Sequence, residues 1–321
     1  MGIFRRNRGR QRDGREVPRD DAFEFFSVHE GALFRRTVRE AFAEHGLEVT
    51  LYAQHAADNT GRQFGLGNLA ATCHHDDRGR RLWPQLIRRH ISVLLRTLDG
   101  PSALDTMPAE QLLRRVYPRI VDSDLLDRGH FGYARPLTPG LCEVLALDLP
   151  DSVMLLNDES LEPLGGVHAL RAQAVRNLRS LPVEGHEAVE QDDGQRFHVV
   201  MGDSFFTASR VLVLDELVQQ VTGRPLGPDG ALVAMPFRHQ LVFHPIEDIS
   251  VIASLGGIAR YAAAGHEDAV GPVSPHLFWW RAGELVQLSE LDEGTLTVTV
   301  GADFQDVLER LAEQAEGGRE G

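Results

Sequence analysis

The second half of the chain combines two hydrophobic periodicities. Pairs of short apolar runs, each predicted to be a strand, precede longer stretches with apolar residues at helical spacing. Strands are expected at 141–148 and 152–156, 187–190 and 196–201, 231–235 and 239–244, and 276–281, 284–288 and 295–300, with helices at 159–180, 207–222, 248–264 and 303–313. This order predicts an α+β fold: a mostly antiparallel sheet built from successive strand–strand–helix units, with helices packed on one face. The units share no sequence signature, so the pattern alone does not make them a repeat.

The first half of the chain is less regular. The segment 127–140 (DRGHFGYARPLTPG) is rich in Gly and Pro, which predicts a subdomain boundary. We expect an N-terminal α+β subdomain at 23–135 and a C-terminal one at 136–314, between disordered tails at 1–22 and 315–321. Within the first subdomain, helices are predicted over 30–45, 82–98 and 108–116, and strands over 47–53 and 63–73.

Charge is unevenly distributed along the 321 residues. The net charge is −14, yet residues 1–19 hold seven Arg against Asp13 and Glu16. The acidic remainder should repel nucleic acid, so a nucleic-acid partner is not expected. The Arg-rich segment predicts a solvated tail, with contact to an anionic membrane through residues 1–19 as the alternative. The chain contains no lysine, which excludes a lysine Schiff base and a phosphate-loop lysine.

Cofactor, metal and secretion signals are weak throughout. Two cysteines and the lack of a secretory signal predict a cytoplasmic protein. No Gly-rich nucleotide loop appears, so no cofactor is expected. The run Cys73-His74-His75 would point its side chains in different directions on a strand, so no metal site is expected either.

The stretch FHVVMGDSFFTASRVL at 197–212 resembles the way one class of esterases presents its nucleophile. In that interpretation Ser204, with Asp203 beside it, would be catalytic and would need a histidine base. The only Asp-x-x-His motif, at 127–130, lies upstream of Ser204, in the wrong order for those esterases. A turn that starts a helix is therefore favoured over a nucleophile.

Arginines outside that motif suggest a binding site. Arg210, next to Ser209, starts a helix that reads as buried, so its charge needs an anion, and Asp203 is a candidate. On the preceding helix, Asn177 borders the apolar stripe and should fix a loop backbone, while Arg176 and Arg179 share an adjoining face. The candidate binding residues are Arg176, Asn177, Arg179, Ser209 and Arg210. We hypothesise that the arginines and Asn177 line one pocket for an acidic group, although structural or solvated roles are more common for each.

Several segments are similar to the YtpQ-like bacterial family, a domain of unknown function. They include VYPRIV at 116–121, ALDLPDSVMLLNDESLE at 146–162, AVRNLRSLP at 174–182, ASRVL at 208–212, MPFRHQLVFHP at 235–245 and GPVSPHLFWWRAGELVQL at 271–288. The resemblance spans roughly residues 30–300 and implies one continuous family unit. It brings no activity, cofactor or catalytic residue, and Gly202-Asp203-Ser204 lies outside the family pattern. The Arg-rich tail and the acidic body also depart from it.

The sequence thus favours a non-catalytic binding or adaptor protein whose partner is another protein or a small anionic ligand. A serine hydrolase using Ser204 and a membrane-surface protein docked by its tail are the alternatives. Labelling of Ser204 by a fluorophosphonate separates the first two, and salt-sensitive binding to anionic vesicles tests the third.

Overall fold

The computed structural model describes residues 18–99, 102–126, 129–150, 152–191, 194–267, 269–292 and 294–317. The chain divides into two compact units, Met1–Leu94 and Leu95–Gly321. The predicted tail contact through residues 1–19 falls mostly outside the described residues. Asp20 is already ordered, because it is buried and accepts two hydrogen bonds from Arg35 (2.7 and 2.8 Å). The tail predicted over 1–22 therefore extends too far toward the C-terminus, because its last residues belong to the folded unit.

The first unit is a small α+β body. Helix α1 (Val28–Glu44) begins with a capping box in which Ser27 and Glu30 satisfy each other's backbone N–H groups. Strands β1 (Val49–Leu51), β2 (His55–Asp58) and β3 (Gln63–Gly65) form an antiparallel sheet, and α2 (Gly67–His74), the 3-10 turn η1 (Arg80–Leu82) and α3 (Trp83–Asp99) follow. The strand predicted over 63–73 was wrong beyond Gly65, because that apolar run continues as a helix.

The second unit contains a small sheet centred on strand β6 (Leu141–Leu149). Strand β4 (Val116–Asp122) pairs with one edge of β6, while β5 (Arg135–Thr138) and β7 (Ser152–Leu155) pair with the other. The surrounding helices and 3-10 turns are α4 (Ala103–Thr106), α5 (Ala109–Arg115), η2 (Ser123–Leu125), α6 (Asp158–Leu161), η3 (Glu162–Leu164) and α7 (Val167–Arg179). The helix predicted over 159–180 is interrupted by Gly165 and Gly166, both at positive φ.

A larger sheet of six antiparallel strands follows, in the order β13-β12-β10-β11-β9-β8. Its strands are β8 (Gly185–Glu190), β9 (Arg196–Met201), β10 (Ala231–Ala234), β11 (Gln240–Pro245), β12 (Leu277–Arg281) and β13 (Glu284–Gln287). The hairpin β14 (Ser289–Asp292) and β15 (Thr295–Val298) comes next. The helical elements are η4 (Ala208–Val213), α8 (Leu214–Thr222), α9 (Val251–Glu267) and α10 (Ala302–Gly317). These antiparallel sheets and helices confirm the predicted α+β class.

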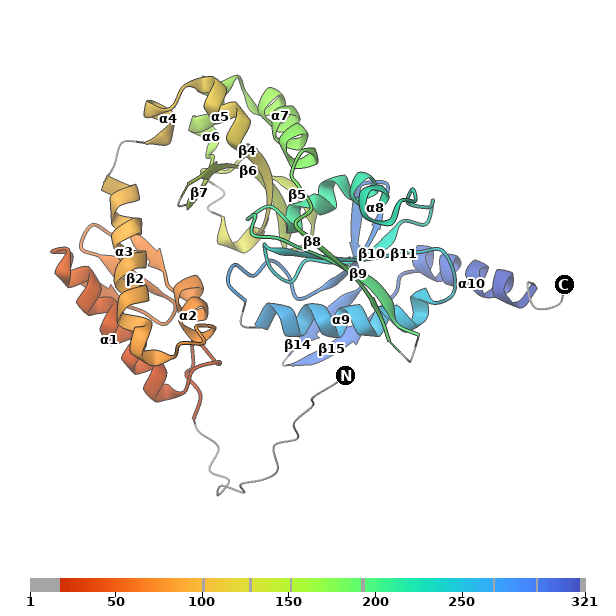
Figure 1. Ribbon diagram of the computed structural model, residues 1–321, viewed down its shortest axis with the longest axis horizontal. Coiled ribbons are helices and arrows are strands. Elements are labelled where there is room, and N and C mark those ends of the chain that lie inside the picture. The colour runs from red at the N-terminus through yellow and green to blue at the C-terminus, as the bar shows by residue number, and fades with distance from the viewer. Residues whose placement is uncertain are drawn as a thin grey trace. The chain divides into compact units, whose positions relative to one another are not determined.

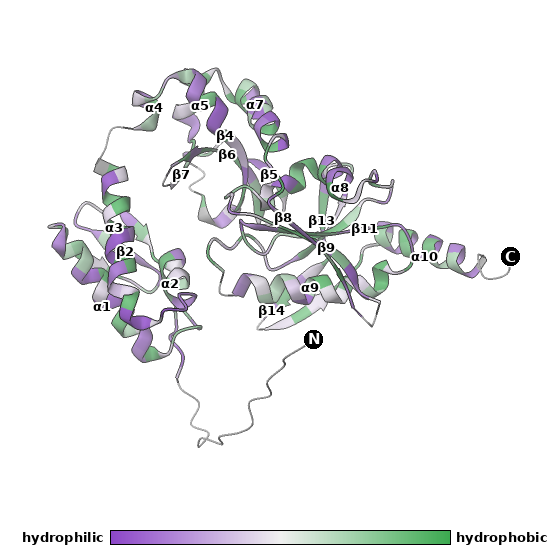
Figure 2. Cartoon of the chain, in the orientation of Figure 1, coloured by the Kyte–Doolittle hydropathy of each residue, from purple (hydrophilic) through white to green (hydrophobic). Residues whose placement is uncertain are grey.

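Helical elements cover both faces of the larger sheet, so the prediction of one covered face was wrong. Ala231 and Val233 pack toward η4 and α8, whereas Leu232 and Ala234 pack toward α9 and α10. Figure 1 shows α8 and α9 on opposite sides of these strands. In Figure 2, hydrophobic and hydrophilic residues alternate along α10, as expected for a helix with one packed face.

The division between the compact units differs from the expected boundary at 135/136. The Gly- and Pro-rich segment 127–140 lies between β4 and β6, which pair along their whole length from Val116↔Leu147 to Asp122↔Leu141. A segment that joins two paired strands belongs to one unit. The predicted C-terminal tail also begins later than 315, because α10 runs to Gly317.

Candidate functional site

Asn177 fastens the junction between α5 and β4. Its Nδ2 atom donates to the carbonyl oxygens of Leu113 (2.8 Å) and Val116 (2.7 Å). Its Oδ1 atom accepts from Nε2 of Gln173 (2.7 Å). Asn177 therefore fixes backbone, as expected for an amide at the edge of an apolar stripe, and has both N–H groups engaged.

Arg176 and Arg179 are exposed and already have partners. Arg176 donates from Nη2 to Oε1 of Gln173 (2.6 Å), and Arg179 donates from Nε to Oε1 of Glu216 on α8 (2.8 Å). Exposed pairs of this kind contribute little to stability. Neither guanidinium group therefore needs a bound ligand to provide it with a hydrogen-bond acceptor.

Arg210 is buried without a carboxylate partner. It is 2% exposed and donates from Nη1 to the carbonyl of Pro182 (3.1 Å) and from Nη2 to Oε1 of Gln220 (3.0 Å). Its Nε atom has no partner, and burial lowers its pKa. The hypothesis that Asp203 neutralises Arg210 was wrong, because Asp203 is exposed and Arg210 is held by neutral acceptors. Arg210 ties the end of α7 to α8.

The predicted pocket is thereby divided between two structural junctions. Asn177, with Gln173 and Arg176, serves the α5–β4 junction, whereas Arg179 and Arg210 hold residues one turn apart on α8. These contacts explain the side chains without a bound anion.

Ser204 lies in a turn between β9 and η4. Its Oγ atom accepts from the N–H of Phe206 (3.2 Å), and its carbonyl accepts from Oγ1 of Thr207 (3.0 Å). His239 does approach this turn, with Nδ1 3.1 Å from the carbonyl oxygen of Gly202. Its other nitrogen, Nε2, accepts a hydrogen bond from Nε of Arg238 (2.9 Å). With both ring nitrogens engaged, His239 is not placed as a base for Ser204.

Arg238, in the turn that precedes β11, is held in a fixed position. Its guanidinium carbon lies 4.3 Å from the centroid of the Phe205 ring, and its Nε atom is bound to His239. Gly271, at φ +76°, approaches so closely that a Cβ there would lie 2.6–2.8 Å from Cδ, Nε and Nη1 of Arg238. Only the terminal nitrogens of Arg238 remain without a hydrogen-bond partner among the described residues.

Arg119 is a second half-buried arginine, in the middle of β4. Burial lowers its pKa, and no hydrogen bond or ion pair from a described residue reaches its guanidinium. Along β4 it shares a face with Tyr117, whose ring stacks on Phe206 with centroids 4.6 Å apart. Phe205, the neighbour of Phe206, lies under Arg238. The consecutive residues Phe205 and Phe206 therefore contact Arg238 and the Tyr117 face of β4, respectively.

Two consecutive residues of the 3-10 turn η4, Ala208 and Ser209, form hydrogen bonds with the segments that carry Arg238 and Arg119. Ser209 Oγ accepts from the N–H of Ile120, directly after Arg119 (3.1 Å). The N–H of Ala208 donates to the carbonyl of Arg238 itself (3.1 Å). Ser209, a predicted binding residue, is instead a buried positioning residue for β4.

The two guanidinium groups form a positively charged site. Burial, and after it the charge of Arg119, lower the pKa of Arg238 to about 10. Among the described residues no carboxylate forms an ion pair with either group. The unpartnered nitrogens of both guanidinium groups are not fully buried, so these nitrogens contact solvent. Two like charges held together in this way favour an anion between them.

The sequence contained a signal for this site that we did not use. In VYPRIV, Val116, Pro118 and Ile120 form the buried face of β4, and Arg119 is the one charged residue of this stretch, on the opposite face beside Tyr117 and Val121. In MPFRHQLVF, Arg238 lies in the short turn between the buried strands β10 and β11. A half-buried charge among apolar residues needs a partner, and long-range geometry was required to show that no acid of the described residues pairs with either arginine.

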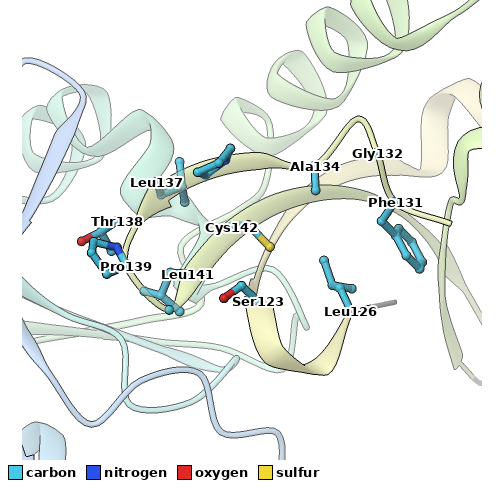
Figure 3. A pocket seen from close by; sticks show the side chains of 12 residues that line it. Ser123, Leu126, Phe131, Gly132, Ala134, Leu137, Thr138, Pro139, Leu141 and Cys142 are labelled. Carbon is cyan, nitrogen blue, oxygen red and sulfur yellow. The ribbon is translucent and has the colours of Figure 1, made fainter. Parts of the chain in front are cut away.

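A cavity of about 540 Å³ lies elsewhere in the same unit, along β5, β6 and η2. Figure 3 shows its lining, in which Leu126, Phe131 and Leu141 are apolar and Ser123 and Cys142 supply a hydroxyl and a thiol. None of its lining residues is charged. It offers nothing to hold an anion and is separate from the arginine site.

Within the described part of the chain, no cluster of three or more His, Cys, Asp or Glu side chains is arranged to hold a metal ion. None of the described helices combines the length and apolar character needed to cross a membrane. Comparisons with protein-family models, curated proteins and solved structures found no match to this chain, so the resemblance to the YtpQ-like family stays a prediction.

Proposed function

We propose that this chain is a non-catalytic binding protein that holds an anionic group between Arg119 and Arg238. One observation carries the proposal: consecutive residues of η4 hold the segments of two half-buried arginines, the charge of Arg119 acts on Arg238, and no described carboxylate is paired to either. The proposal keeps the predicted type of function and moves the site away from Arg176, Asn177, Arg179 and Arg210. It includes the predicted cytoplasmic location and membership of the YtpQ-like family.

The local architecture supports a preorganised site. Arg238 is held by Phe205, His239 and Gly271, so little side-chain freedom remains to be lost when an anion binds. Arg119 is placed by the hydrogen bond between Ile120 and Ser209. A bound anion would offset the repulsion between the two charges, which makes binding and stability linked quantities.

Isothermal titration with an anion panel tests the proposal. The panel contains inorganic phosphate, methyl phosphate, sulfate and acetate, each against sodium chloride at equal ionic strength. We expect saturable binding of at least one member, weakened tenfold or more in both Arg119→Gln and Arg238→Gln. The control Arg179→Gln removes an exposed arginine paired with Glu216 and should bind as the wild type does.

Two results would overturn the proposal. One is the lack of saturable binding of any anion in the panel. The other is binding that is equal in Arg119→Gln, Arg238→Gln and Arg179→Gln. Circular dichroism of each variant confirms that its fold is intact, and Arg238→Lys, which keeps the charge and loses the planar fork, provides a second variant at the more enclosed position.

A further inference from the structure

We propose that the anion held by Arg119 and Arg238 is the dianionic phosphoryl group of a phosphate monoester. This inference rests on the proposed function and adds the chemical class of the ligand. It follows from the charge of the site, from the arrangement of its donors and from the positions of the acids beside His239.

The charge of the site requires more than a monoanion. The two guanidinium groups carry two positive charges, and no described acid is paired with them. A carboxylate would leave one of these charges uncompensated in a half-buried position. A phosphate monoester carries about −1.5 to −2 at pH 7 and matches both.

The donors also favour a tetrahedral group. Arg238 presents its terminal N–H groups from the turn that precedes β11, because its Nε edge faces His239 and its flat face lies on Phe205. Arg119 presents its donors from β4, a different sheet. A planar carboxylate is satisfied by one arginine fork, whereas three terminal phosphoryl oxygens can accept from two forks that approach from different directions.

The acidic side chains beside the turn that His239 contacts leave this arrangement intact. Asp203 and Glu184 lie at the end of β9, where Oε2 of Glu184 accepts from the N–H of Asp203 (2.5 Å). Neither forms an ion pair with Arg119 or Arg238. The pKa of His239 is lowered by burial and by Arg238, and hydrogen bonds to the backbone of Gly202 and Ser204, followed by the charge of Asp203, only partly restore it. A neutral His239 keeps its Nε2 lone pair on Arg238.

The experiment compares methyl phosphate, inorganic phosphate, sulfate and acetate by isothermal titration at pH 7.5 and pH 5. Methyl phosphate and the tetrahedral dianion sulfate should bind at least tenfold more tightly than acetate at pH 7.5. At pH 5 most of the phosphate ester becomes a monoanion, since its second pKa is about 6, and its affinity should fall about tenfold relative to sulfate. Arg119→Gln should abolish the preference over acetate.

The outcomes separate this inference from the proposed function. Acetate binding as tightly as methyl phosphate, with both arginines required, would overturn the phosphoryl inference and leave anion binding standing. Binding of inorganic phosphate but not methyl phosphate would overturn the monoester. Failure of every anion to bind would remove the proposed function as well.

Discussion

Arg238 and His239 are neighbours in the chain, and Arg238 donates a hydrogen bond from Nε to Nε2 of His239 (2.9 Å). Because Nε2 accepts, the proton of the neutral ring lies on Nδ1, next to the carbonyl oxygen of Gly202 (3.1 Å). Burial and the charge of Arg238 lower the pKa of His239, which favours this neutral form. The ring therefore orients Arg238 and links it to the turn that contains Ser204.

This relationship leads to a prediction for Ser204. Since neither nitrogen of His239 is free to take its proton, Ser204 should behave as an ordinary hydroxyl. Incubation with a fluorophosphonate probe should label wild type and Ser204→Ala equally, at background level. Labelling that disappears in Ser204→Ala would restore the hydrolase alternative.

Arg119→Gln should stabilise the protein in chloride buffer. The substitution removes one of two like charges held near each other, which we expect to raise the free energy of unfolding by about 1 kcal/mol. Urea unfolding measures this change. A purely structural role for Arg119 predicts the opposite sign, and adding sulfate should stabilise the wild type more than the variant.

Gly271→Ala should weaken anion binding. Gly271 has φ +76°, and its new Cβ would displace the Arg238 side chain, lying 2.6 Å from Cδ. Gly223→Ala is the matched control, because Gly223 has φ +75° and no atom within 4 Å of an added Cβ. Both variants should lose about 1 kcal/mol of stability from backbone strain. Only Gly271→Ala should also lose affinity for the panel anions, and equal affinities in the two variants would contradict the role of Gly271.

Asn177→Ala should destabilise the fold without altering anion binding. The carbonyl groups of Leu113 and Val116 would lose their donor, at a cost of about 1–3 kcal/mol. Arg176→Gln, one position away and exposed, should change stability by less than about 0.5 kcal/mol. Thermal and urea unfolding compare the two. A loss of anion affinity in Asn177→Ala would contradict this purely structural role and would indicate that Asn177 takes part in anion binding.

His244 should make stability depend on pH. Burial, and after it Arg196, lower the pKa of His244 to about 4. Between pH 6.5 and pH 4 the unfolded chain therefore binds a proton that the folded chain does not, so this contribution to stability is complete above pH 6.5 and is lost as pH falls to 4. The loss amounts to about 3 kcal/mol. Urea unfolding at pH 7 and pH 4 should show a correspondingly smaller loss in His244→Gln, and an unchanged loss would contradict the assignment.

Hydrophobic periodicity was sufficient to predict the fold class and most strand pairs of the second unit. The hydrophobic pattern gave the wrong prediction where tertiary packing determines the secondary structure or the burial of a strand face. The apolar residues 66–73 satisfied a strand pattern, yet they form α2 directly after β3. Strand β10 (ALVA) is buried at all four positions. Such a continuous apolar run is typical of a strand covered on both faces, and this signal argued against one open face.

The candidate site was less predictable than the fold. Arg176, Arg179 and Arg210 stood out because of their spacing and helix positions, and each proved to have a local partner. Arg119 and Arg238 are far apart in the sequence. Whether a buried arginine is paired depends on which acids the fold brings to it, and periodicity does not contain that information.

The pairing of β6 has a consequence for self-association. Strand β4 occupies one edge of β6, and β5 and β7 lie end to end along the other. The most apolar long strand of this sheet thus offers another molecule little free backbone with which to form intermolecular β-structure. At the β8 edge of the larger sheet, the exposed acids Glu187 and Glu190 would repel an approaching copy of the same strand. The apolar strand β6 is therefore paired along both edges, and the β8 edge carries charges that disfavour pairing with a second copy.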